Sequence, residues 1–160
     1  MSTHTISLLV ENRHGALSRI ANLFSGRGYN ISSLTVAETE DATVSRMTIV
    51  VAGDEEILEQ IVKQLNKLID VIKVIDFIDQ PIFERELLLV RVDSSRGNRH
   101  ELLDLCDMFG ARILGVAQKS VTIEFAGHTS SIEDFIAMVR PYGIKEIVRS
   151  GAVAIADTKS

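Results

Sequence analysis

The chain has 160 residues, of which 46% are apolar and 24% are charged, a balance typical of folded globular proteins and not of disordered ones. Its formal net charge of −5 argues against a nucleic-acid-binding surface, and no apolar run approaches the roughly 20 residues that span a bilayer. The start of the chain lacks signal-peptide features, and its single cysteine, Cys106, allows neither an intramolecular disulfide nor a cysteine-based zinc site, so we expect a soluble protein of the reducing cytoplasm.

The first half of the chain alternates strand patterns with helix patterns. Four strands are predicted from their β-branched and apolar content, over residues 3–10, 30–38, 43–51 and 71–78. Two helices are predicted between them, one over residues 15–27 and one that begins after Gly53. In both, apolar residues recur every three or four positions, as on the buried face of an amphipathic helix.

The second half repeats this order with similar residues. The segment Thr48-Ile49-Val50-Val51-Ala52-Gly53 has a counterpart in Thr122-Ile123-Glu124-Phe125-Ala126-Gly127. Strands are predicted over residues 86–92, 112–117, 120–126 and 144–156, the last with a turn at Ser150-Gly151. Two helices are predicted to begin with capping boxes, formed by Asn98 with Glu101 and by Ser130 with Glu133, and Pro141 is expected to end the second.

Each half therefore has the pattern βαββαβ, which predicts a fold of the α+β class. We expect two tandem ferredoxin-like domains, each an antiparallel sheet covered by two helices. The predicted boundaries are residues 1–78 for the first domain, 79–84 for a linker that contains Pro81, and 85–160 for the second domain. Small cores and open sheet edges also predict that the chain dimerises.

No pattern of catalytic or metal-binding residues stands out. The four histidines lack metal-ligand spacing, and neither glycine-rich phosphate-loop pattern is present. Cys106 lies on the apolar stripe of its helix, which favours a buried structural thiol over a reactive one.

The segment between the first strand and the first helix is the candidate binding site. A helix N-terminus offers free N–H groups and partial positive charge to a carboxylate, and Gly15 lets a ligand approach closely. Asn12 both donates and accepts hydrogen bonds, which suits the ammonium and carboxylate of an amino acid. A purely structural reading also fits, in which Asn12 caps the helix and Gly15 eases a tight turn. In the second half Glu101 aligns with Gly15 and Arg112 with Asn30, so a site for an anionic group is expected only in the first half.

Two stretches carry a family resemblance, Asn12-x-x-Gly15-Ala16-Leu17-Ser18-Arg19-Ile20 and Leu23-Phe24-Ser25-x-Arg27-Gly28-Tyr29-Asn30-Ile31, and Ser45-Arg46-Met47-Thr48 extends it. With these segments the sequence resembles the small, regulatory subunit of acetohydroxyacid synthase (acetolactate synthase) over essentially its whole length. The first half alone resembles an ACT domain, a general amino-acid-sensing module.

The resemblance implies a non-catalytic subunit that activates a catalytic large subunit and confers feedback inhibition in branched-chain amino acid biosynthesis. Its ACT domain would form a homodimer and bind valine at the interface, with isoleucine or leucine as weaker effectors. The thiamine diphosphate, Mg²⁺ and FAD implied by the family belong to the catalytic partner, and no cofactor or metal is expected in this chain.

The resemblance also implies which residues bind the effector. The family's ligand positions correspond here to Asn12, Gly15 and Asn30, and four adjacent residues are expected to line the site: His14, Ala16, Leu17 and Ile31. Two other functions remain open, a free-standing ACT-type sensor that controls another enzyme or transcription, and an acylphosphatase-type enzyme with Arg13 as its phosphate ligand.

Overall fold

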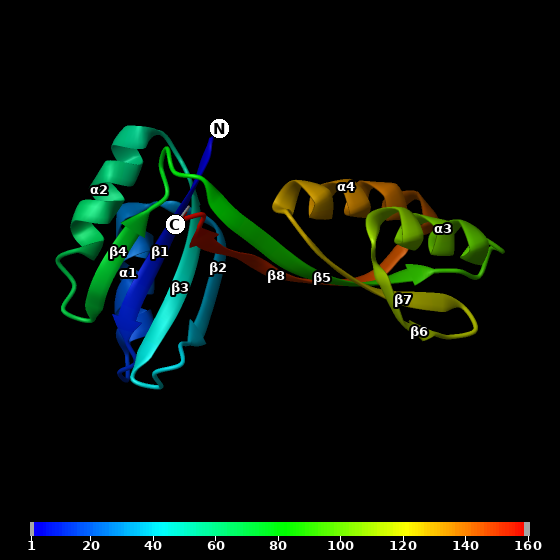
Figure 1. The fold of residues 1–160 in the computed structure, drawn as a ribbon, viewed down its shortest axis with the longest axis horizontal. Helices are drawn as coiled ribbons and strands as arrows, with labels where there is room; N and C mark the ends of the chain where they lie inside the picture. Colours follow the sequence, from blue (N-terminus) through cyan, green and yellow to red (C-terminus); the bar gives the residue numbers. More distant parts are fainter. Residues whose placement is uncertain (1, 159–160) are drawn as a thin grey trace. The chain divides into compact units, whose positions relative to one another are not determined.

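The computed structural model describes residues 2–158. They divide into two compact units, one formed by residues 2–83 together with 152–158 and the other by residues 84–151. Each unit is built on a four-stranded antiparallel sheet with helices packed against it (Figure 1). The predicted α+β class and the two tandem ferredoxin-like βαββαβ folds are confirmed. None of the helices in the described part of the chain has the length and apolar character needed to cross a membrane.

The first unit contains six elements whose order along the chain matches the prediction: β1 (Thr3–Glu11), α1 (Ala16–Arg27), β2 (Asn30–Glu38), β3 (Val44–Ala52), α2 (Glu55–Leu65) and β4 (Val71–Asp76). The strands lie in the order β2-β3-β1-β4, so β2 and β4 form the sheet edges. Alternate residues of the central strands are buried, including Ile6 and Leu8 of β1 opposite Ile49 and Met47 of β3. These residues pack with the apolar stripes of the helices to form the first core.

The other face of the first sheet meets the last residues of the chain. The guanidinium of Arg46 donates to Ser7 Oγ at 2.9 Å and to the carbonyl of Ala154 at 3.4 Å. The Asp157 amide donates to the Pro81 carbonyl at 2.9 Å. Ala152 and Ala154 are buried because this segment packs within the first unit. The compact first unit therefore includes this segment, and the domain division that assigns residues 85–160 to the second domain stays a prediction.

The second unit uses the same plan, with the elements β5 (Ile82–Asp93), α3 (Arg99–Phe109), β6 (Arg112–Val116), β7 (Ser120–Gly127), α4 (Thr129–Val139), a 3₁₀ turn (Arg140–Tyr142) and β8 (Ile144–Ala156). Its strand order is β6-β7-β5-β8. Phe109, Phe125 and Phe135 meet in its core with ring centroids 5.2 to 5.8 Å apart. Cys106 is buried in the same core.

Both predicted capping boxes are wrong. Asn98 stands at the N-cap of α3, but its amide donates to the Asp93 carbonyl at 2.9 Å and caps no helix N–H group. Helix α4 is capped two residues earlier than predicted, because the His128 ring accepts the Ser130 N–H at 3.2 Å. Glu133 instead binds Arg149, at 2.7 Å.

The ends of the long strands also differ from the prediction. Strand β5 begins at Ile82, inside the predicted linker. Strand β8 runs without interruption through the predicted turn, although Gly151 has a φ of 82°. Because glycine adopts a positive φ without steric strain, the strand passes through Gly151 without a separate turn.

Candidate functional site

The loop from β1 to α1 leaves the N-terminus of α1 without a side-chain cap. Gly15 is the N-cap residue, with a φ of 83°, and no side chain accepts from the first helical N–H groups. Asn12 does not cap the helix, because its amide donates to the Ala42 carbonyl at 3.0 Å and to Glu38 Oε1 at 3.2 Å. The first-turn amides of Leu17 and Ser18, which have no intrahelical acceptor, remain available to an anion. The structural reading of this loop is therefore correct only in part. Gly15 forms a tight turn, but Asn12 does not cap the helix.

An ion pair that was not predicted from the sequence supports the loop from β1 to α1. Arg19, one turn into α1, donates to the Asp70 carboxylate through Nε at 2.5 Å and through Nη2 at 3.1 Å. The same Nη2 donates to the His14 carbonyl at 3.2 Å. The Asp70 side chain is only 1% exposed, and its hydrogen bond with Arg19 lowers the pKa of the Asp70 carboxyl. The pair therefore fixes the backbone just before Gly15.

At Gly15, the Arg19 side chain occupies the space that a larger residue would need. A Cβ atom at Gly15 would stand 3.0 Å from Arg19 Nη1, which is closer than ordinary van der Waals contact. The only sequence signal for this contact was the four-residue spacing between Gly15 and Arg19, which places both on one side of the helix start.

The structure places Asn30 far from the loop within one chain. Asn30 and Thr3 both pair with Ala52, at one end of the sheet. Glu11, which leads into the loop, pairs with Val44 at the opposite end. Eight strand residues at about 3.3 Å each put the two ends roughly 25 Å apart. A single copy of the chain therefore does not bring Asn30 to Asn12 and Gly15.

The remaining predicted residues differ in how much surface they offer. Leu17 is 49% exposed beside the helix N-terminus, and His14 is exposed in the loop. Ala16 is buried in the first core, and Ile31 is partly buried against it. Leu17 is thus the apolar side chain that the loop itself presents to a ligand.

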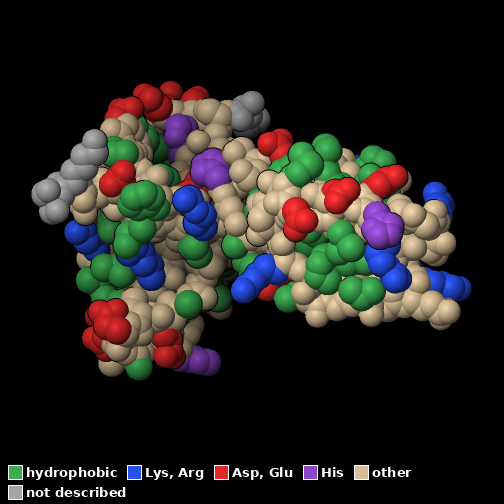
Figure 2. Space-filling model, turned by 45° about the vertical axis from the view of Figure 1, so that its right-hand side comes forward, with side chains coloured by type: hydrophobic (Ala, Val, Ile, Leu, Met, Phe, Trp, Pro, Cys, Tyr) green, Lys and Arg blue, Asp and Glu red, His purple; other side chains and the backbone are tan. Residues whose placement is uncertain are grey.

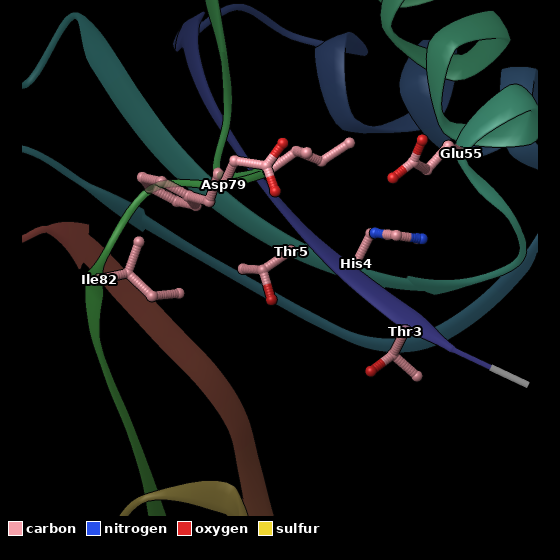
Figure 3. Close-up of a pocket in the computed structure, with 8 residues that line it drawn as sticks. Thr3, His4, Thr5, Glu55, Asp79 and Ile82 are labelled. Carbon is pink, nitrogen blue, oxygen red and sulfur yellow. The ribbon is translucent and has the colours of Figure 1, made fainter.

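A separate pocket of about 300 Å³ lies at the Asn30 end of the sheet (Figure 3). Its lining includes His4 of β1 and Glu55 of α2, with Asp79 from the segment that follows β4 and Ile82 from the start of β5. The His4 ring lies 3.1 Å from the Gly53 carbonyl, so one ring nitrogen already has a partner. None of the predicted effector-binding residues lines this pocket, and residues 2–158 contain no group of three side chains suited to a metal.

The corresponding loop of the second unit leads into a helix whose first turn carries a negative charge. Its N-cap residue, Asn98, is the structural counterpart of Gly15, so the sequence alignment of Glu101 with Gly15 is displaced by three residues. Glu101 lies in the first turn of α3 and accepts a hydrogen bond from Tyr142, which raises the pKa of the Tyr142 hydroxyl. Arg112 and Asn30 do correspond, because each is the first residue of an edge strand.

Comparison with known proteins identifies the family. Residues 6–73 match the model of the acetolactate synthase small subunit-like ACT domain, and residues 85–158 match that of the small subunit of acetolactate synthase. The probable acetolactate synthase small subunit of Archaeoglobus fulgidus is 49% identical over 95% of both chains, and the small subunit of Mycobacterium leprae is 46% identical over 98% of this chain and 92% of its own. The crystal structure of the small subunit from Thermotoga maritima, 36% identical, superposes over the full length of both chains with a TM-score of 0.91. The chain therefore belongs to the family of acetolactate synthase small subunits, as its sequence motifs predicted.

Proposed function

We propose that this chain is the regulatory subunit that binds the catalytic subunit of acetolactate synthase in the cytoplasm, activates it and makes it sensitive to valine. The observation that carries the proposal is that both halves of the chain match the family of small subunits. The catalytic chemistry, with its thiamine diphosphate, Mg²⁺ and FAD, would belong to the partner, and this chain would contribute no catalytic residue.

The effector site would form between two copies of the first unit. Strand β2 is an edge strand, and Leu34 and Val36 on it are 38% and 40% exposed. Apolar side chains at the surface of this unit are visible in Figure 2. If two β2 strands pair antiparallel around a two-fold axis, the Asn30 end of one copy meets the Glu38 end of the other. Since Asn12 donates to Glu38, this pairing brings Asn30 of one copy toward Asn12 of the other, and it creates two equivalent sites.

Each part of valine has a suitable partner in such a site. The carboxylate would lie at the N-terminus of α1, where the amides of Leu17 and Ser18 point outward and the helix dipole is favourable. Asn12 and Asn30 would orient the ligand through their amides, and the isopropyl group would contact Leu17. One methylene changes binding by only about 1–3 kcal/mol in an apolar pocket, so isoleucine and leucine are expected to act as weaker effectors.

Regulation then requires that valine bind two states of the dimer unequally. An effector changes the catalytic subunit only by its difference in affinity between the state that activates and the state that does not. A site shared by two copies supplies such a difference, because any change in the pairing of the β2 strands changes the distance between the two halves of the site.

The proposal is tested by reconstitution. The full chain is mixed with its catalytic subunit, and acetolactate formation is measured with and without valine. We expect faster turnover when the chain is added and a loss of that activity as valine is titrated. Stable association with activation but no response to valine would contradict the effector role, and absence of association would contradict the proposal as a whole.

A further inference from the structure

The Arg19 guanidinium uses only part of its hydrogen-bonding capacity within the chain. Its Nε and Nη2 atoms bind the Asp70 carboxylate side by side, and Nη2 also donates to the His14 carbonyl. This mode of binding leaves both N–H groups of Nη1 directed away from Asp70. In the described part of the chain, Nη1 donates to no acceptor.

The unused Nη1 lies at the candidate effector site. It is the atom nearest to a Cβ built on Gly15, at 3.0 Å, and Gly15 is the N-cap of α1. The Arg19 side chain is 46% exposed although Asp70 beneath it is 1% exposed. The outer edge of the guanidinium therefore faces solvent beside the same helix N-terminus that we propose binds the valine carboxylate.

We propose that Arg19 is an additional ligand of the effector carboxylate, through Nη1, and that Asp70 is the positioning residue that holds it there. This inference rests on the proposed function, since it concerns the same site. An arginine can bind two carboxylates along different edges of its planar group, so the internal pair with Asp70 does not compete with the ligand. The buried Asp70 also fixes the guanidinium before the ligand arrives, which reduces the ordering that binding requires.

The second unit lacks this arrangement. The residue four positions after its N-cap Asn98 is Leu102, which is fully buried in the second core. A leucine there packs against the sheet and offers no donor to the loop. The arginine of the first unit is thus absent from the corresponding place in the repeat.

The test measures how strongly binding depends on the ligand's carboxylate. The dissociation constants of valine and of valinamide, which has no carboxylate, are measured by calorimetry, with competition by valine for the weaker ligand. In the unmodified chain we expect valine to bind far more tightly than valinamide. Arg19→Gln should weaken the binding of valine about 10-fold to 100-fold, which is the effect of losing a hydrogen bond to a charged group. The same change should weaken the binding of valinamide much less. Asp70→Asn should reduce the preference for valine over valinamide by a smaller factor than Arg19→Gln does.

Controls separate this role from general effects of charge and folding. Arg27→Gln removes an arginine from the last turn of the same helix and should leave both constants unchanged. If thermal unfolding shows that Arg19→Gln does not fold, Arg19→Lys is measured instead. Lysine has one side-chain nitrogen, so it cannot bind Asp70 through two nitrogens and present a third to the ligand. An unchanged preference for valine over valinamide in a folded Arg19 variant, or an equal loss for both ligands, would overturn the inference while leaving the proposed function intact. If the unmodified chain binds no valine, both fail.

Discussion

In both units the first strand leads through a loop into a helix, and the two loops differ in what they leave open. The first loop ends at Gly15 with no side-chain cap, and Asn12 reaches sideways to Ala42 and Glu38. The second loop ends at Asn98, whose amide returns to the Asp93 carbonyl. Glu101 adds a negative charge to the first turn of α3, which would repel an anion. The same fold therefore keeps a potential carboxylate site in one copy and lacks it in the other.

The edge strands extend this comparison. Strand β2 has nine residues and begins with Asn30, whereas β6 has five and begins with Arg112. A long edge strand can pair with a second copy over several hydrogen bonds, and a short one offers little template for pairing. The first unit thus combines the open helix terminus with the longer free edge, which is the combination that a site between two copies requires.

The largest expected effect is a loss of stability that is confined to one of the two units. Phe135→Ala removes a fully buried ring from the second core and should destabilise that unit by about 3–5 kcal/mol. Because each unit has its own core, hydrogen exchange should rise mainly in residues 84–151, and valine binding should persist. Phe24→Ala, the matched change in the first core, should abolish valine binding instead. Loss of valine binding in the Phe135 variant with the first unit still protected would contradict this division of roles.

The next effect concerns the open helix terminus. Gly15→Asp should weaken the binding of valine about 100-fold or more. It adds a carboxylate within reach of Arg19 Nη1, and the aspartate would have to adopt the φ of 83° that glycine has here. Gly15→Asn has nearly the same size without the charge and should lose less affinity. Gly28→Asp places the same charge at another positive-φ glycine with open space around it, and should leave inhibition intact. An inhibition curve for the Gly15→Asp synthase that matches the unmodified one would refute the site assignment.

A smaller effect is expected at the edge strands. Asn30→Ala should weaken valine binding by about 1–3 kcal/mol, the usual effect of leaving a buried polar partner unsatisfied. Arg112→Ala changes the corresponding residue of β6 and should leave the titration unchanged. Calorimetry with both variants measures the difference, and equal affinities for the two would remove Asn30 from the site.

The sequence predicted the features that depend on local periodicity. Strand and helix order, the stop of α1 at Gly28 and the buried Cys106 all follow from patterns within a few residues. It did not predict contacts between distant segments. Arg19 and Asp70 are 51 positions apart, and nothing local marks Asp70 as buried. The capping boxes at Asn98 and Ser130 were wrong because the Asn98 amide donates to the Asp93 carbonyl and because α4 begins earlier, with His128 as its N-cap.

The smallest effect is a dependence of stability on acid pH that comes from the Arg19–Asp70 pair beside the first loop. Folding lowers the pKa of Asp70 below its usual 3.8, because Arg19 hydrogen-bonds its ionised form. The pair's contribution is therefore complete above pH 3.8 and is lost as the pH falls below that value toward the folded-state pKa. Asp70→Asn should lower the unfolding temperature at pH 7, and this deficit should shrink as the pH falls from about 4 to 2. Glu59→Gln, which removes an exposed partner of Lys63, should show almost no deficit at any pH. A deficit of Asp70→Asn that stays constant across this range would show that the ionised pair does not stabilise the loop.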